Sequence, residues 1–168
     1  RYRTFKDLGY SVIGLSHSPV PWRPNLDPTP FVHKLFWKLK IPLDVTSVNS
    51  KIRKEIKESS FDIVWIEKGN TIYPSTLLYI KKIQSSVRLI SCSEDDMYVS
   101  HGHSLWYRLG LRYYDIVFTT KVYNLTELKL FGAKKTELFL DAYDETIHKP
   151  MTLTDSELKR FSCDVGAI

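Results

Sequence analysis

The most regular pattern in this chain is a set of short apolar runs, each of which ends in polar or charged residues. The runs lie at residues 10–16, 61–66, 87–92 and 114–119, and they are rich in β-branched and aromatic side chains. Runs of this length without alternation are typical of parallel strands that are covered on both faces. We therefore expect a buried strand at each of them, with a further short strand at 136–140.

Segments with helical spacing separate these runs. Val48, Ile52 and Ile56 recur every four residues, and Asp44 or Thr46 could cap the start of that helix. Further helices are predicted over residues 74–83, 104–113 and 122–131. Alternating strands and helices predict an α/β fold, here a Rossmann-like three-layer sandwich with a mostly parallel sheet.

Polar residues follow the predicted strands at their carboxyl ends. His17 follows the first run and Lys121 closely follows the fourth. The two runs between them lead into the clusters Glu67-Lys68-Gly69-Asn70 and Glu94-Asp95-Asp96. Ligands of open parallel sheets bind beyond the carboxyl ends of the strands. The sequence therefore predicts a functional site on one rim of the sheet.

The residue types on this rim suit proton transfer and anion binding. Neighbouring carboxylates repel each other, so one of them can hold its proton to higher pH and act as a general base, or the set can bind a hydrated cation. A histidine can take a proton from a hydroxyl group, and a lysine can pair with a phosphate. The candidate catalytic residues are His17, Asp95 and Asp96, and the candidate substrate-binding residues are Glu67, Lys68, Gly69, Asn70 and Lys121.

Each cluster also has a structural explanation. The acidic cluster fits a solvated loop in which an aspartate caps a helix. Glu67 and Lys68 could pair with each other in a surface turn, and Lys121 could lie in solvent beside a capping threonine. His101 and His103 have a metal-like spacing, but no cysteine or carboxylate completes a local set, so we expect no metal site.

The net charge of +5 favours anionic partners such as nucleotides, phosphorylated sugars or acidic lipid surfaces. No known nucleic-acid-binding motif accompanies the charge, so we expect no nucleic-acid partner. The basic, aromatic segment 31–40 predicts a helix with two alternative roles. It could pack its Phe and Leu side chains on the sheet, or it could make a peripheral contact with an acidic membrane.

No apolar run approaches the roughly 20 residues that cross a bilayer, and no signal peptide precedes the first helix. We therefore expect a soluble, cytoplasmic protein. Cys92 and Cys163 have no metal-binding spacing, so both are expected to be free, buried thiols.

The chain is expected to begin inside a βαβ unit, because residues 1–8 are typical of a helix whose preceding strand is not in the sequence. Thr154 and Glu157 have the spacing of a capping box, which predicts a short helix. We expect residues 1–150 to form a Rossmann-like domain that lacks its first strand. Residues 151–168 would then form a linker helix and the start of a truncated second domain.

A resemblance to a known family rests on four segments. They are Tyr114–Leu128, in which a strand leads into Thr119-Thr120-Lys121, then Phe131-Gly132-Ala133, Ala142-Tyr143-Asp144 and His148-Lys149-Pro150. This set resembles the N-terminal domain of GT-B glycosyltransferases, and it is similar to the spore-maturation-protein-type (glycosyltransferase family 1/4-like) group. Asp164-Val165-Gly166 is similar to the opening strand of the second domain in that group.

The resemblance implies two Rossmann-like domains that face each other across a cleft. The N-terminal domain receives the acceptor, and the C-terminal domain binds the nucleotide-sugar donor. The chain would then be the acceptor-side half of an enzyme that transfers a sugar to an acceptor hydroxyl on a glycan, lipid or protein. The resemblance implies no metal and no cofactor beyond the donor substrate, and an isolated fragment that is inactive without the missing C-terminal domain. It also implies that the absent first strand is central in the sheet.

The alternative interpretation is a non-catalytic α/β binding or scaffolding module. Such a module would use the same fold and the same rim without chemistry.

Overall fold

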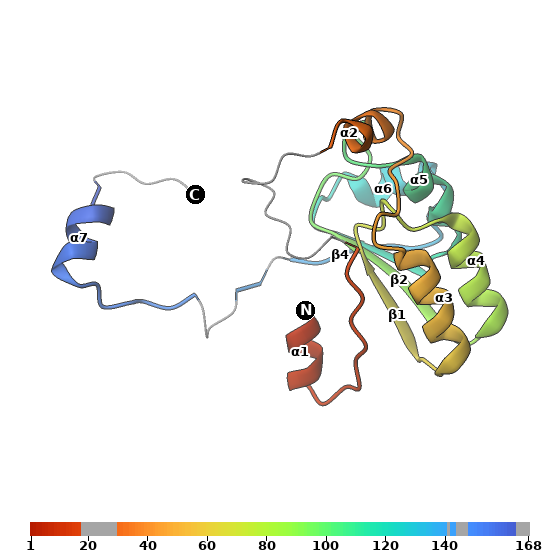
Figure 1. Cartoon of the computed structure of the whole chain (residues 1–168), viewed down its shortest axis with the longest axis horizontal. Coiled ribbons are helices and arrows are strands. Elements are labelled where there is room, and N and C mark those ends of the chain that lie inside the picture. Colours follow the sequence, from red (N-terminus) through yellow and green to blue (C-terminus); the bar gives the residue numbers. More distant parts are fainter. Residues whose placement is uncertain (18–29, 141, 144–147, 164–168) are drawn as a thin grey trace.

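The computed structural model of the chain describes residues 1–17, 30–140, 142–143 and 148–163. Helices and strands alternate along most of the chain, as the hydrophobic pattern predicts (Figure 1). In chain order the elements are α1 (Tyr2–Asp7), α2 (Phe31–Lys38), α3 (Val48–Glu58), β1 (Ile63–Glu67), α4 (Pro74–Ile83), β2 (Arg88–Ser93), α5 (Leu105–Gly110), the 3-10 helix η1 (Leu111–Tyr113), β3 (Ile116–Thr119), α6 (Asn124–Leu130), β4 (Thr136–Leu138) and α7 (Asp155–Phe161).

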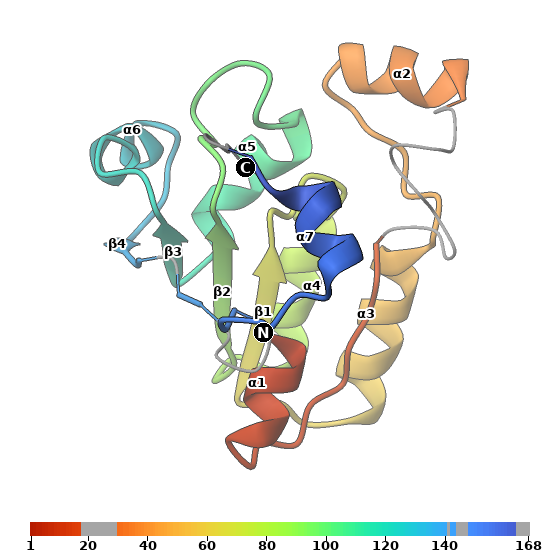
Figure 2. The same cartoon turned by 90° about the vertical axis from the view of Figure 1, so that its left-hand side faces the viewer.

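The strands form one sheet in the order β1-β2-β3-β4, and every neighbouring pair is parallel (Figure 2). The connecting helices α4, α5 and α6 lie on one face of the sheet, because right-handed crossovers that all step in the same direction place their helices on the same side. Helix α3 packs beside α4 on that face (Figure 1). This arrangement confirms the predicted α/β class with a parallel sheet.

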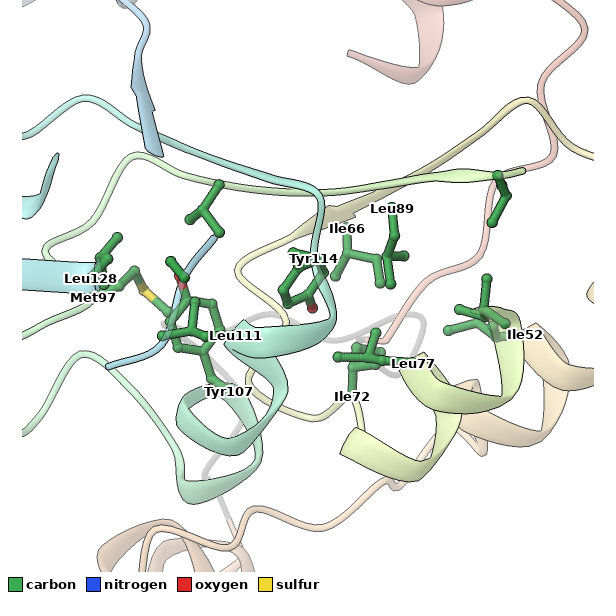
Figure 3. Close-up of a cluster of buried hydrophobic side chains, with 14 of the residues drawn as sticks. Ile52, Ile66, Ile72, Leu77, Leu89, Met97, Tyr107, Leu111, Tyr114 and Leu128 are labelled. Carbon is green, nitrogen blue, oxygen red and sulfur yellow. The ribbon is translucent and has the colours of Figure 1, made fainter. Parts of the chain in front are cut away.

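The main hydrophobic core lies between the sheet and this helical layer (Figure 3). The strands contribute Ile66 and Leu89, and the helices contribute Leu77 and Leu128. The three leucines are at most 1% exposed. Burial of such side chains stabilises the fold by about 1.5–3 kcal/mol each, so this layer holds the sheet in place.

The opposite face of the sheet carries a row of aromatic rings beneath α1. Phe5 of α1 meets the edge of Trp65 on β1, with the ring centroids 5.6 Å apart. Trp65 stacks on Phe118 of β3 at 5.8 Å, and Phe118 meets Phe139 at 6.3 Å. Because α1 covers this row, the sheet lies between two helical layers, as in a Rossmann-like three-layer fold.

Asp115 links three elements just before β3. Its carboxylate accepts a hydrogen bond from the N–H of Leu89, at 2.8 Å, and forms an ion pair with Lys81 of α4. Burial opposes the charge, but the bonds from Lys81 and Leu89 outweigh it and hold the pKa of Asp115 below its ordinary value. Both side chains of the pair are less than a quarter exposed, at 22% for Lys81 and 21% for Asp115. The pair therefore fastens α4, the helix between β1 and β2, to the start of β3.

The strand predicted at residues 10–16 is not formed, so that prediction is wrong. The segment runs as an irregular extended chain, and no backbone hydrogen bond joins described residues 10–17 to β1. An apolar, β-branched run fixes only a preference for extended backbone, whereas a strand also needs a neighbour within hydrogen-bonding distance. As a result β1 is an edge strand, and its Ile63 is 51% exposed.

Two further predictions fail on burial. Helix α2 forms as expected, but none of its residues is buried and Phe31 is 78% exposed, so it does not pack its Phe and Leu side chains on the sheet. Cys92 is a buried free thiol, whereas Cys163 is free and exposed. In both cases the pattern identified apolar character correctly but could not tell whether another element covers it.

The predicted helix caps are confirmed. The two carboxylate oxygens of Asp44 accept from the N–H groups of Val48 and Asn49, at 2.8 and 2.9 Å. Thr154 and Glu157 form the reciprocal capping box that opens α7. Asp144 and residues 164–166, which carry part of the family resemblance, lie outside the described residues, and the domain division at residue 150 stays a prediction. Among the helices of the described ranges, none has the length and apolar character needed to cross a membrane.

Candidate functional site

A groove of about 2100 Å³ runs along the free edge of β1. Its apolar walls come from β1, from extended residues 10–15, and from α1 and α3 on the two faces of the sheet. Polar residues gather where β1 and β2 end, because parallel strands bring their carboxyl ends to the same rim. The groove is lined there by His17, Glu67, Lys68, Gly69, Asn70, Asp95 and Asp96.

The structure thus brings together on one groove all but one of the residues selected from the sequence. The exception is Lys121, which follows β3 on the same rim but does not line the groove. Its N–H donates to Oγ1 of Thr119 at 3.1 Å in a local turn. No threonine caps the following helix α6, whose N-cap residue is Tyr123, so the capping threonine of the structural alternative is not formed.

Lys68 and Asp95 bridge the loops that follow β1 and β2. The ammonium of Lys68 forms an ion pair with Oδ2 of Asp95, so Lys68 does not pair with the neighbouring Glu67 as the surface-turn alternative had it. The two side chains are 52% and 54% exposed. Exposed ion pairs contribute little to stability. A ligand could therefore separate this pair and use both groups at small cost.

Gly69 follows Lys68 in the left-handed region, with φ values of 68° and 56° for the two residues. A Cβ at Gly69 would lie 2.9 Å from the hydroxyl oxygen of Tyr114 and 3.3 Å from a methyl group of Ile66. Tyr114 is fully buried under the loop, and burial raises its pKa. The glycine is therefore required for the loop to close over Tyr114, a packing reason that the sequence pattern did not reveal.

Arg1 organises the acidic side of the rim and was missed by the sequence analysis. One guanidinium nitrogen contacts both oxygens of Glu67 at 2.9 and 2.8 Å, and the other contacts Glu94 at 2.7 Å. The same group lies over the ring of Phe139, 5.1 Å from its centroid. Burial opposes the charge, but the bonds to the two glutamates raise the pKa of Arg1. Nothing in the local sequence could have indicated this residue, because its partners are 66 and 93 positions away.

Glu67 is further held by the indole of Trp65, whose Nε1–H donates to it at 2.7 Å. With Arg1 and Trp65 both bound, Glu67 presents little free acceptor capacity to the groove. Its arrangement supports a role in positioning Arg1 beside the rim.

Asp96 is the most constrained carboxylate of the site. Its Oδ1 accepts from the N–H of Tyr98 at 3.0 Å, from the N–H of Val99 at 3.3 Å, and from the side-chain amide of Asn124 at 3.0 Å. Partial burial opposes the charge, but these bonds and one from Tyr123 outweigh it, so the pKa of Asp96 lies below its ordinary value. A general base needs a free lone pair and a pKa near neutral, so this geometry favours a loop-holding role for Asp96.

Asn124 completes this network and was also not selected from the sequence. Its side chain is fully buried, and its amide group donates to Asp96 and to Glu127, at 3.0 and 2.9 Å. Its carbonyl oxygen accepts from the N–H of Met97 at 3.2 Å. The asparagine therefore fastens the loop after β2 to the start of α6.

Asn70 clamps the loop after β1 to the start of α5. Its side chain donates to the carbonyl of Gly102 at 3.1 Å and accepts from the N–H of Ser104 at 2.8 Å. The hydroxyl of Ser104 returns a bond to the carbonyl of Asn70 at 2.7 Å. A Cβ at Gly102 would lie 2.0 Å from the carbonyl oxygen of Asp96, so only glycine fits there. Asn70 thus shapes the wall of the groove through bonds that the sequence did not predict.

The acidic cluster separates in space into three different contacts. Glu94 binds Arg1, Asp95 binds Lys68, and Asp96 binds the loop around Asn124. In the described ranges, no set of three His, Cys, Asp or Glu side chains is placed to hold a metal ion. Among the residues selected from the sequence, His17, Lys68 and Asp95 remain accessible along the groove, a set suited to binding a polar ligand and accepting a proton.

A scan against protein-family models and a search of the curated proteins found no match to this chain.

Proposed function

We propose that this chain is the acceptor-side domain of a GT-B type glycosyltransferase, which transfers a sugar from a nucleotide-sugar donor to an acceptor hydroxyl. One observation carries the proposal: the loops after β1 and β2 present Lys68 and Asp95 together at the open end of a groove along an all-parallel sheet. Ligand sites of such sheets lie at this rim. The resemblance of the segment around Tyr114–Leu128 to the family supplies the reaction class.

In the proposed reaction the acceptor oxygen attacks the anomeric carbon of the donor sugar. The bond from that carbon to the phosphate oxygen breaks, and the nucleoside diphosphate leaves. The acceptor proton passes to Asp95 or His17, the two bases that we select at the end of the groove near Lys68. Lys68 would leave Asp95 as the acceptor enters and would then lie near the developing negative charge. Lys121, which follows β3 on the same rim, would add positive charge on the side of β3.

The same geometry refines the roles of the other candidates. Asp96 and Asn70 hold the two loops that form the groove wall. Gly69 allows the first loop to pack on Tyr114. These three residues would affect the reaction through the shape of the site, and Asp95 and His17 through proton transfer.

The test is a transfer assay with the natural, full-length protein. The protein is incubated with a panel of nucleotide-sugars and acceptor saccharides, and the release of nucleoside diphosphate and the glycosylated product are measured together. We expect Asp95→Asn and His17→Ala to lower the turnover, with at least one of them lowering it about 100-fold or more. Asp155→Asn, an equal charge change on α7 far along the chain from the groove, should leave turnover unchanged. Full activity in both groove variants would contradict these assignments.

One observation favours the alternative of a non-catalytic binding module. Each carboxylate that follows β1 and β2 already has a partner in the chain. A saccharide or nucleotide-sugar that binds the groove with no product formed, and with binding weakened by Lys68→Ala, would support this alternative over the enzyme.

A further inference from the structure

Helix α2 and its C-cap residue Leu39 expose a continuous apolar stripe. Phe31, Leu35 and Leu39 follow one another at helical spacing of four residues, and Val32 lies beside them. Their exposed fractions are 78%, 42%, 57% and 51% in that order. Leaving four large apolar side chains in water on one helix face is costly, and such a face usually marks a binding surface.

The stripe points away from the body of the protein. The residues of α2 that line the groove are His33, Lys34, Trp37 and Lys38, and none of the four stripe residues is among them. The helix lies at the upper margin of the molecule in both views, beyond the ends of the strands (Figures 1 and 2). A flat surface could therefore reach the stripe without meeting the other helices of the folded core.

The end of α2 is fastened to the core. The carbonyl of Lys40 accepts from the N–H of Leu105 at 2.7 Å, and the carbonyl of Pro42 accepts from the indole of Trp106 at 3.2 Å. Both donors belong to α5, whose first residue Leu105 is itself 39% exposed beside this junction. The helix is thus held in its exposed position by α5.

The charge around the stripe has one sign. From residue 30 to residue 43 the chain carries Lys34, Lys38 and Lys40 and no aspartate or glutamate. Lys34 and Lys38 lie on the same turns as Leu35 and Leu39. A short helix with an apolar face and flanking lysines is the composition that binds at the interface of an anionic bilayer.

We propose that the stripe of Phe31, Val32, Leu35 and Leu39 is a membrane-docking surface that binds bilayers containing anionic lipids. The four apolar side chains enter the boundary between headgroups and acyl chains, and Lys34 and Lys38 bind the lipid phosphates. None of the four apolar residues lines the groove, whereas Lys34 and Lys38 lie on the side of α2 between the stripe and the groove. Vesicle binding by this surface is measured without substrate, so it does not depend on the proposed glycosyltransferase activity.

Co-sedimentation with large unilamellar vesicles tests the proposal. The protein is mixed with vesicles of phosphatidylcholine alone or with 30% phosphatidylserine, at about 0.1 M salt. We expect binding to the phosphatidylserine vesicles and little binding to phosphatidylcholine. Lys34→Ala with Lys38→Ala should weaken binding about 30-fold, since each lysine near an anionic surface contributes roughly fivefold. Phe31→Ser with Leu35→Ser should weaken it by a similar or larger factor.

A matched control separates this surface from general attraction between a basic protein and an acidic vesicle. Lys51→Ala with Lys57→Ala removes the same charge from exposed positions of α3 and should change binding by less than threefold. Equal losses in the two lysine pairs, or equal binding to both kinds of vesicle, would overturn the proposal. Sedimentation equilibrium of the Phe31→Ser, Leu35→Ser protein covers the remaining case: a dimer of the original chain that this variant dissociates would assign the stripe to self-association instead. Circular dichroism confirms that each variant is folded.

Discussion

The neighbouring carboxylates Asp95 and Asp96 should differ sharply in what they contribute to stability. Asp96 accepts hydrogen bonds from Tyr98, Val99 and Asn124 inside the described network, whereas Asp95 forms an ion pair with Lys68 that is more than half exposed. Substitution of each aspartate by alanine therefore compares a loop-holding carboxylate with a solvent-exposed one at adjacent positions. The original sequence offered no basis for telling the two apart.

The expected magnitude follows from the bonds that are lost. A hydrogen bond to a charged group contributes about 1.5–3 kcal/mol, but the N–H groups of Tyr98 and Val99 are only partly buried and can bond to water instead. Asn124 is fully buried, and it keeps its second bond, to Glu127. We therefore expect Asp96→Ala to lower the free energy of unfolding by about 2–3 kcal/mol in total. For a chain of this size this corresponds to a fall in Tm of roughly 5–10 °C. Asp95→Ala should change the free energy of unfolding by less than about 0.5 kcal/mol.

The assay is urea unfolding followed by tryptophan fluorescence, with the midpoint and the slope fitted separately. A double-mutant cycle with Asn124→Ala measures the coupling between Asp96 and Asn124, which we expect to be about 1 kcal/mol or more. Equal losses of less than 0.5 kcal/mol for the two alanine variants, with no coupling to Asn124, would refute the loop-holding role of Asp96. In that case its place as a candidate base would stand.

The pH dependence of the same difference has a definite sign. The pKa of Asp96 is lower in the folded chain than in the unfolded chain. Its contribution is therefore fully present above the unfolded pKa, which is about 3.9 for aspartate, and it is lost as the pH falls through the folded pKa. The gap in unfolding free energy between the original chain and Asp96→Ala should be constant from pH 8 to pH 5 and should shrink below pH 4.

Three further outcomes follow from the structure. Gly69→Ala should destabilise the fold by about 2–3 kcal/mol, because it adds a close contact with Tyr114 to an unfavourable positive φ. Gly9 also has a positive φ but has open space around it, so Gly9→Ala should cost only about 1 kcal/mol. Equal shifts in Tm for the two variants would contradict the contact with Tyr114. Asp115→Asn should lower the free energy of unfolding by about 1–2 kcal/mol at pH 7, because the ion pair with Lys81 is lost. The pKa of Asp115 is lowered in the folded state, so this loss of stability should fade below pH 4. If urea unfolding at pH 3 still shows the full difference between the variant and the original chain, the role of the ion pair is refuted. In hydrogen exchange followed by NMR, the odd-numbered backbone amides of β1 should exchange at least about tenfold faster than the even-numbered ones. The reason is that the even-numbered residues form backbone hydrogen bonds with β2, whereas the odd-numbered N–H groups face the groove. Uniform protection along β1 would show that its free edge is paired.

The sequence alone determined most of the elements and the rim on which polar residues gather. The runs that became β1, β2 and β3 are short, apolar and β-branched, and such backbone preferences depend on neighbouring residues in the chain. The caps at Asp44 and Thr154 could be predicted for the same reason, since their partners lie within five residues. Because parallel strands end at one rim, the sequence also predicted that Glu67, Lys68, Asp95 and Asp96 would meet there.

Only the tertiary structure decided what those groups bind and what covers each apolar segment. Residues 10–16 have the composition of a strand but no paired neighbour, and the stripe on α2 has the composition of a packed helix but no covering layer. Arg1, Asn124 and Gly102 entered the site through contacts with residues distant in the chain. Local sequence sets the backbone preference and the polarity of a segment, whereas hydrogen-bond partners, burial and pKa shifts depend on which distant atoms come within a few ångströms of it.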